Sequence, residues 1–330
     1  PYLNYSINRN ASQPPCAAAL NFLQSFLLTF LPFRGTIITK KTAARRIPER
    51  IKVMSAEFKL GINICQGFGE SVEAGIDATA RAGFDACFTG WNEGADVRGW
   101  AERIRGNGMI YQSVHSPFGK CDKLWDEGEA GDAFADVLIH CLHDCAENDV
   151  PIMVVHPIIG MDRHTPTPIG IERFGRIVAE AEKTPVKLAF ENVEGIEYLE
   201  AIIKELGSSP AVGYCWDTGH EMCYNFSRDV PALFGDKLIC THLNDNFGMT
   251  DPSVVTWHDD SHMMPFDGIA DWDGIVGRLK RAGYHDILTF ELTCRSKPGK
   301  NTHAAYEALG LDGFLRLARE KGEKIAEMMK

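Results

Sequence analysis

The sequence predicts an α/β fold, a single-domain (β/α)8 TIM barrel preceded by a leader that lies outside the barrel. From residue 58 onward, short apolar segments rich in β-branched and aromatic residues alternate eight times with helical segments. Residues 54–330 are close to the roughly 250 residues that such a barrel usually takes. Carboxylates and imidazoles also follow several of the apolar segments, where a barrel places its active site.

Each expected strand is a short apolar run that ends at a loop. The sixth is the clearest, because Val212-Gly213-Tyr214-Cys215-Trp216 is apolar up to Asp217, and Gly219 marks a turn directly afterwards. The same pattern predicts strands at residues 58–65, 87–91, 109–115, 152–156, 186–191, 212–217, 237–242 and 287–291.

A helical segment follows each strand. Ser71 is a suitable N-cap for the first helix, and Gly83 is a suitable C-terminal stop. Residues 80–85 and 280–285 both end a helix on Gly and place an aromatic residue before a strand, which favours a repeated βα unit. A doubly wound sheet is the competing fold, but Gly67-Phe68-Gly69 is too short for its phosphate-binding turn. Helices are expected near residues 71–82, 97–106, 130–148, 171–183, 195–206, 229–234, 272–282 and 304–330.

Residues 1–53 differ from the rest of the chain. They hold eight basic residues and one acidic residue. The apolar run 17–33 is interrupted by polar residues and is short for a membrane span, and the positive charges follow it, unlike in a secretory signal. We interpret 1–53 as sequence upstream of a start at Met54, or as a transit-like segment, and expect it to pack loosely.

Charge and cysteine content exclude some classes of function. The chain carries a net charge of −11, so residues 54–330 carry −18, which disfavours binding to a nucleic-acid backbone. The ten cysteines include no CxxC pair, which indicates a reducing compartment, and we expect a cytoplasmic protein.

The expected partner is a small sugar or sugar phosphate. We expect no binding to nucleic acid or to a membrane, and a homo-oligomer is compatible with the sequence.

Four residues at the ends of the last four strands predict a metal site. Carboxylates and one imidazole form a mixed oxygen and nitrogen set, which suits a divalent Mn, Mg, Co or Zn ion. Any one of them alone would be an ordinary polar residue, but four on consecutive strands converge at one barrel mouth. These residues are Glu191, Asp217, His242 and Glu291.

Other residues are weaker candidates for this site. His115 and His156 end the third and fourth strands, and His220 follows the sixth, so each is a candidate for substrate binding or a further metal ligand. Asp260 and His262 lie on a loop, where a solvated turn is the alternative. Trp91 is a further candidate for substrate binding, and the alternative interpretation is that its ring only packs against neighbouring residues. Arg295 is another candidate, and the alternative is that it is an ordinary solvated residue of a loop.

Five motifs resemble the xylose-isomerase-like TIM-barrel superfamily, and most of all its sugar (phosphate) isomerase/epimerase members. The resemblance covers residues 58–320. It implies that Glu191 and Glu291 are metal ligands and also the two acid/base groups, that Asp217 and His242 complete the metal sphere, and that His156 and His220 lie near substrate hydroxyls. The motifs are Phe190-Glu191-Asn192, Trp216-Asp217-Thr218-Gly219-His220, Thr241-His242-Leu243-Asn244-Asp245, Asp260 to Gly268, and Phe290-Glu291-Leu292.

The expected function is therefore metal-dependent isomerisation or epimerisation of a sugar, ketose or sugar phosphate. Removal of a proton beside a carbonyl needs a nearby base and a positive charge that stabilises the enediolate. Two carboxylates on opposite sides take the proton from one face and return it on the other, or to the neighbouring carbon. Loss of a β-hydroxyl would instead make the enzyme a dehydratase.

Two alternatives belong to other classes. A barrel that binds sugar without turnover has no need of paired glutamates. The superfamily also contains apurinic/apyrimidinic endonucleases of the endonuclease IV type, with three zinc ions suited to phosphodiester cleavage. The acidic body and the absence of a basic, aromatic DNA-gripping loop argue against this activity. The endonuclease ligand pattern can be laid on His115, His156, Glu191, Asp217, His220, His242, Asp260, His262 and Glu291.

Overall fold

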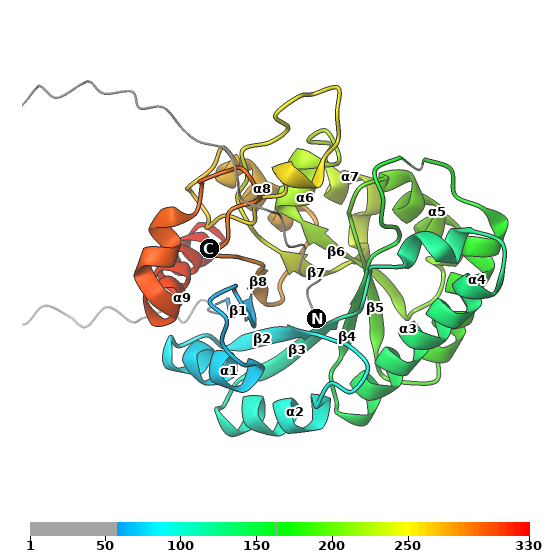
Figure 1. Ribbon diagram of the computed structural model, residues 1–330, viewed down its shortest axis with the longest axis horizontal. Coiled ribbons are helices and arrows are strands. Elements are labelled where there is room, and N and C mark those ends of the chain that lie inside the picture. Colours follow the sequence, from blue (N-terminus) through cyan, green and yellow to red (C-terminus); the bar gives the residue numbers. More distant parts are fainter. Residues whose placement is uncertain (1–57, 163) are drawn as a thin grey trace, which may run out of the picture. The chain divides into compact units, whose positions relative to one another are not determined.

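The computed structural model describes residues 58–162 and 164–330, and within them eight parallel strands form a barrel (Figure 1). The sheet runs in the order β7-β6-β5-β4-β3-β2-β1-β8. A parallel bridge between Leu243 and Phe290, with a 2.8 Å hydrogen bond from Leu243 N to Thr289 O, joins its two edges. The strands are β1 (Leu60–Asn63), β2 (Ala86–Gly90), β3 (Ile110–His115), β4 (Ile152–Val155), β5 (Lys187–Glu191), β6 (Val212–Asp217), β7 (Leu238–His242) and β8 (Leu288–Phe290).

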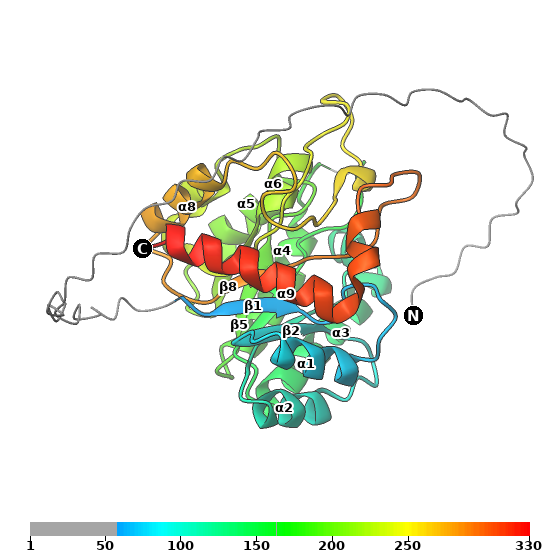
Figure 2. The same ribbon diagram turned by 90° about the vertical axis from the view of Figure 1, so that its left-hand side faces the viewer.

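Helices surround the strands, and Figure 2 shows α9 lying along the side of the barrel beside β1. Short 3-10 helices occupy Cys121–Trp125, Gly235–Lys237 and Trp257–Asp259. The α-helices of the described residues are α1 (Val72–Arg81), α2 (Val97–Gly106), α3 (Glu129–Glu147), α4 (Pro168–Ala181), α5 (Ile196–Leu206), α6 (Thr218–Cys223), α7 (Val230–Phe234), α8 (Trp272–Arg281) and α9 (Ala304–Met328).

The predicted TIM barrel is confirmed, and the differences lie at element ends and in short helices. Ser71 caps α1 by accepting a 3.3 Å hydrogen bond from Ala74 N, and Gly83 follows the helix with φ +86°, a conformation that favours glycine. The sequence pattern missed α6, because Thr218–Cys223 is too short for a helical period to be visible. It also missed the break within α9 at Gly310, where φ is +62°.

A small cluster of buried apolar side chains, Ile152, Val154, Ala189, Cys215 and Cys240, is contributed by β4 to β7. Side chains alternate between the two faces of a strand, so Ala189 and Cys215 face inward together with Glu191 and Asp217, two residues further on. On β7, Cys240 is related to His242 in the same way. The alternation therefore aims the last residues of three adjacent strands into the mouth of the barrel.

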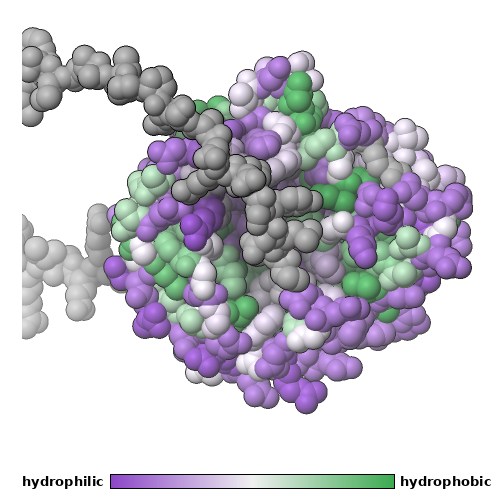
Figure 3. Space-filling model, viewed as in Figure 1, coloured by the Kyte–Doolittle hydropathy of each residue, from purple (hydrophilic) through white to green (hydrophobic). Residues whose placement is uncertain are grey.

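The predicted leader, residues 1–53, lies outside the described residues. Among the described helices, none combines the length and the apolar character needed to cross a lipid bilayer. Figure 3 shows a face on which hydrophilic residues predominate, with scattered apolar patches between them.

Replacing each of two glycines of α4 by alanine should have opposite effects on the stability of the protein. A Cβ on Gly170 would lie 1.9 Å from the ring of Trp125, which is held by a 2.7 Å hydrogen bond to Pro157 O and by packing against Tyr198. Gly170→Ala should therefore lower the free energy of unfolding by about 1–3 kcal/mol, through overpacking. Gly175→Ala is the matched control, because its nearest neighbour lies 3.7 Å away, and it should gain up to about 1 kcal/mol. Urea unfolding followed by circular dichroism measures both, and equal effects would contradict the packing described.

Candidate metal centre

Nine metal-ligand side chains converge at the carboxyl ends of β3 to β8. Their ligand atoms form three groups, and within each group the atoms lie within 4.8 Å of one another. We call Glu191, Asp217, His242 and Glu291 the inner centre. We call His115 and His156, which group with Glu191, the histidine pair, and His220, Asp260 and His262 the outer triad.

The inner centre is arranged around one imidazole nitrogen. Nδ1 of His242 lies 2.9 Å from Glu191 Oε1 and 3.1 Å from Glu291 Oε2. Asp217 caps α6, because its Oδ1 accepts a 2.6 Å hydrogen bond from His220 N. The side chains of Glu191, Asp217 and His242 are fully buried, whereas that of Glu291 is 23% exposed. Glu291 is therefore the member of the inner centre that a ligand reaches from solvent.

The histidine pair faces the other oxygen of Glu191. Nε2 of His156 lies 3.0 Å from Glu191 Oε2, and Nε2 of His115 lies 3.2 Å from the same atom. Nδ1 of His115 contacts Ser116 O at 2.9 Å, which fixes the ring. Phe118 stacks on His156 with 4.5 Å between ring centroids and is itself 43% exposed. Glu191 therefore presents Oε1 to the inner centre and Oε2 to the histidine pair, so its carboxylate is suited to bridging two cations.

The outer triad is assembled by α6 and the long loop after β7. Asp260 Oδ1 lies 3.0 Å from His262 Nε2 and 3.5 Å from His220 Nε2. This oxygen is buried, yet it accepts no hydrogen bond of proper geometry from the described residues. The oxygen and the two imidazole nitrogens are therefore placed as three ligand atoms that face a shared cation would be. His262 has φ +46°, a left-handed conformation that is uncommon for residues other than glycine. Lys297, on the loop after β8, places Nζ 3.0 Å from Asp260 Oδ2.

Buried asparagines orient the inner centre. Asn192 accepts a 2.8 Å hydrogen bond from Asp217 N and donates a 2.9 Å bond to Asp217 O. Asn244 donates from Nδ2 to Asp217 Oδ2 at 2.9 Å. A Cβ on Gly219 would lie 1.9 Å from Asn244 Oδ1, so only glycine leaves room for this amide. Such partners fix the orientation of a ligand carboxylate.

Sequence reasoning did not assign roles to Asn192, Asn244, Phe118 or Lys297. Both asparagines could have been identified from the sequence, because Asn192 directly follows Glu191 and Asn244 lies two residues after His242. Phe118 and Lys297 lie on loops, and their positions follow from tertiary contacts that carry no periodic signal.

Burial and charge act in opposite directions on the pKa values of the inner centre. Burial raises the pKa of Glu191, but the facing imidazoles, above all His242, outweigh it and hold that pKa well below its ordinary value. For His242, burial lowers the pKa, and Glu191 and Glu291 reverse this and raise it well above normal. Burial prevails at Asp217, whose pKa rises to about 6, whereas His242 and His262 lower that of Glu291 to about 2.

The outer triad follows the same rule. Burial lowers the pKa of His262, but Asp260 and Glu291 outweigh it and raise that pKa to about 9. Burial likewise lowers the pKa of His220, and Asp217 and Asp260 raise it well above its ordinary value. The three buried carboxylates and the partly exposed Glu291 thus require positive charge, which protons on the imidazoles or a divalent cation supply.

Trp91 and Arg295 form hydrogen bonds with residues outside the candidate site. The indole Nε1 of Trp91 donates a 2.6 Å hydrogen bond to Asp144 Oδ2 on α3, and its ring packs edge-on against His140. Arg295 donates from Nε to Gly67 O at 2.6 Å and from Nη1 to Glu307 Oε1 at 3.1 Å. Neither contact involves the nine residues of the candidate site.

Proteins similar to this chain include two curated relatives and several solved structures. The protein y4fM of Sinorhizobium fredii is 35% identical over 160 residues, which covers 45% of this chain and 48% of the relative, so the match spans about half of its length. The protein MJ1311 of Methanocaldococcus jannaschii is 25% identical over 307 residues, covering 82% of this chain and 95% of the relative. A crystal structure of D-psicose 3-epimerase in the presence of D-fructose superposes with a TM-score of 0.61 at 17% identity, covering 81% of this chain and 99% of that one, and shows the same fold.

A family model covers most of the barrel. The model described as a xylose isomerase-like TIM barrel matches residues 76–312, from α1 into α9. The match includes all nine residues of the candidate site. The chain belongs to the xylose isomerase-like TIM-barrel family.

Proposed function

We propose that the protein is a metal-dependent isomerase or epimerase of a sugar, a ketose or a sugar phosphate. The observation that carries this proposal is the inner centre, in which both glutamates lie within 3.1 Å of the same nitrogen of His242. Its oxygen and nitrogen donors fit a divalent cation such as Mn²⁺, Mg²⁺, Co²⁺ or Zn²⁺. A D-psicose 3-epimerase with the same fold is consistent with this class of reaction.

In this proposal the two glutamates exchange the substrate proton. Glu291 is partly exposed and takes the proton on the side of the substrate that faces solvent. Glu191, with four imidazoles within 3.6 Å, serves the opposite face. A cation held by the inner centre supplies the positive charge that stabilises the enediolate. His156 and His220 lie beside this centre and orient the hydroxyl groups of the substrate.

We propose that a cavity next to the outer triad accommodates part of the substrate, although none of the nine residues of the candidate site lines it. It has a volume of about 540 Å³ and is lined by residues that follow β4, β5, β6 and β7. That volume is in the range typical of small-molecule sites. Tyr224, one of its lining residues, packs 5.1 Å from the ring of His220, so the cavity borders the outer triad. Phe226 and Val254 are exposed apolar residues in its wall.

Hydrolysis of a phosphoester is the second candidate, and the histidine pair and the outer triad favour it. Together with the inner centre they provide three adjacent ligand groups, which suits a site with several cations. The net charge of −18 over residues 54–330 opposes a nucleic-acid substrate. Lys297 also pairs with Asp260, so part of the negative charge of the outer triad is balanced by a side chain and does not need a metal ion.

A dehydratase and a sugar-binding barrel without turnover are weaker candidates. Roles for Trp91 and Arg295 in substrate binding stay predictions.

Hydrogen exchange separates these candidates. Purified protein loaded with Mn²⁺, Co²⁺ or Zn²⁺ should incorporate deuterium from D₂O beside the carbonyl of at least one ketose or ketose phosphate, as followed by NMR. Treatment with EDTA should abolish the exchange, and the metal should restore it. Cleavage of abasic DNA without any exchange would instead establish the hydrolase.

Glu291→Gln should reduce the exchange rate by about 10²–10⁴-fold, because an amide cannot act as a base. Glu205→Gln is the control, since Glu205 is half exposed and pairs with Lys204 on α5, outside the site. Elemental analysis of both variants separates loss of the base from loss of the metal. Exchange near the wild-type rate in a metal-loaded Glu291→Gln variant would refute the acid/base assignment.

Metal binding should release protons. The pKa values of His220 and His242 are raised well above normal and that of His262 to about 9, so these imidazoles carry protons near neutral pH without a cation. Ligation requires neutral imidazole, so affinity should rise as pH rises towards about 9. Calorimetric titration with Zn²⁺ at pH 7 in buffers of different ionisation enthalpy measures the released protons. His140→Gln, at an exposed position of α3, should leave the release unchanged, and heats independent of the buffer would contradict the account.

A further inference from the structure

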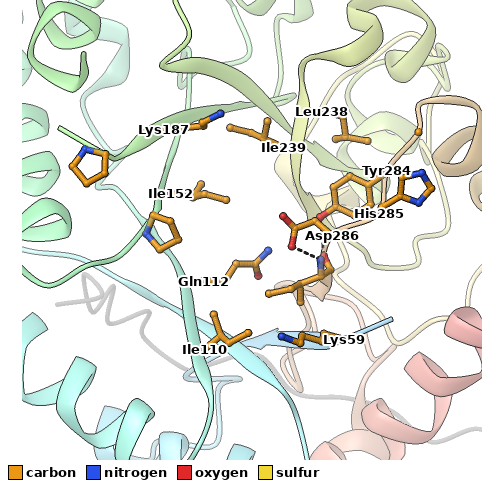
Figure 4. Close-up of a pocket in the computed structure, with 14 residues that line it drawn as sticks. Lys59, Ile110, Gln112, Ile152, Lys187, Leu238, Ile239, Tyr284, His285 and Asp286 are labelled. Carbon is orange, nitrogen blue, oxygen red and sulfur yellow. Dashed lines mark hydrogen bonds between the residues drawn. The ribbon is translucent and has the colours of Figure 1, made fainter. Parts of the chain in front are cut away.

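A second cavity opens at the amino ends of the strands, at the opposite end of the barrel from the metal centre. Its volume is about 700 Å³. Lys59 precedes β1, Ile152 and Lys187 begin β4 and β5, and Leu238 begins β7, and all four line it. Figure 4 shows Lys59 and Lys187 on opposite sides of the cavity, with Gln112 between them.

Two glycines face the interior near this end of the barrel, and neighbouring side chains pack closely against both of them. A Cβ on Gly61 would lie 3.0 Å from Thr289 Oγ1 and 3.3 Å from Gln112 Oε1, and one on Gly213 would lie 2.6 Å from the Ile239 side chain. These positions therefore face the interior but contribute no side chain to it. Above them, small buried residues such as Ala189, together with the Gln112–Thr289 pair, separate the cavity from the metal centre.

The mouth of this cavity carries unbalanced positive charge. Among the described residues, no carboxylate lies within ion-pair distance of Lys59 or Lys187. Their backbones are fixed, because Lys59 O accepts a 2.9 Å hydrogen bond from Leu288 N and Lys187 N donates one of 2.9 Å to Pro151 O. Asp286, the acidic residue of the lining, accepts a 2.7 Å hydrogen bond from Ile287 N. Two ammonium groups without an acidic partner among the described residues attract an anion locally, although the net charge of −18 over residues 54–330 opposes it at long range.

A buried polar atom deeper in the cavity also lacks a partner. Gln112 is 3% exposed, and its Oε1 accepts a hydrogen bond from Thr289 Oγ1. Its Nε2 has no partner among the described residues. Because buried donors are nearly always paired, this amide is suited to an oxygen of a bound molecule. The walls between Gln112 and the lysines are apolar and include Ile110, Ile152 and Leu238.

We propose that this cavity binds a small organic anion. Its phosphate or carboxylate group lies at the mouth with Lys59 and Lys187, its apolar body packs against the aliphatic walls, and a hydroxyl or carbonyl oxygen accepts from Gln112. The site shares no residue with the metal centre and does not depend on the proposed function.

Calorimetric titration of the full chain tests the site with three matched probes. These are 4-hydroxyphenyl phosphate, 4-hydroxyphenylacetate and the neutral 2-(4-hydroxyphenyl)ethanol. At least one anion should bind, more tightly than the alcohol, and the preferred anion identifies the group that is recognised. Lys59→Met and Lys187→Met should each weaken that anion about fivefold, since a partly exposed charge pair contributes up to about that factor, and leave the alcohol unchanged.

Two controls decide the location of the bound anion. Lys204→Met, on the surface of α5 with the lysine side chain 80% exposed, should bind like the wild type. Glu291→Gln should also bind like the wild type, because it alters only the metal centre. Thermal unfolding should show that both cavity variants are folded. The proposal is overturned if neither anion binds at millimolar concentration, if the alcohol binds as tightly, if both cavity variants bind like the wild type, or if Glu291→Gln abolishes binding.

Discussion

The gathering of four carboxylates, three of them buried, at one end of a closed barrel is the constraint on which the site depends. Glu191, Asp217, Asp260 and Glu291 lie within a few ångströms of imidazoles, and only Glu291 shows appreciable exposure. Buried carboxylates need compensating positive charge, and here it comes from raised imidazole pKa values, from Lys297, or from a cation. The asparagine network around Asp217 is the structural consequence, because it holds these repelling groups in place.

Much of this arrangement could be predicted from the sequence, because two simple periodicities determine it. Alternation along a strand and convergence of parallel strands bring together Glu191, Asp217, His242 and Glu291. Loop residues follow no such rule. His262 reaches the site through a left-handed backbone, and Lys297 arrives on another loop. For Trp91, hydrogen bonding to α3 decides where the side chain lies, and neighbouring residues in sequence do not reveal that partner.

A mainly apolar layer separates the two ends of the barrel, and the two ends differ in the charge that they carry. Cys215 and Cys240 lie in that layer directly below the inner centre and form a further ligand group with His242. Burial raises the pKa of the Cys215 thiol, which disfavours its thiolate, whereas the hydrogen bond with Cys215 lowers the pKa of Cys240. The carboxyl end thus concentrates negative charge for a cation, whereas the amino end presents Lys59 and Lys187 around a hollow.

Anomalous diffraction from crystals of the zinc-loaded full chain tests the central claim most directly. The account predicts a peak at about 2.0–2.2 Å from oxygen and nitrogen atoms of the inner centre, the usual range for zinc. Further peaks at the histidine pair and the outer triad would show that the centre holds several ions. An inner centre without a peak, or zinc bound by the thiols of Cys215 and Cys240, would contradict it.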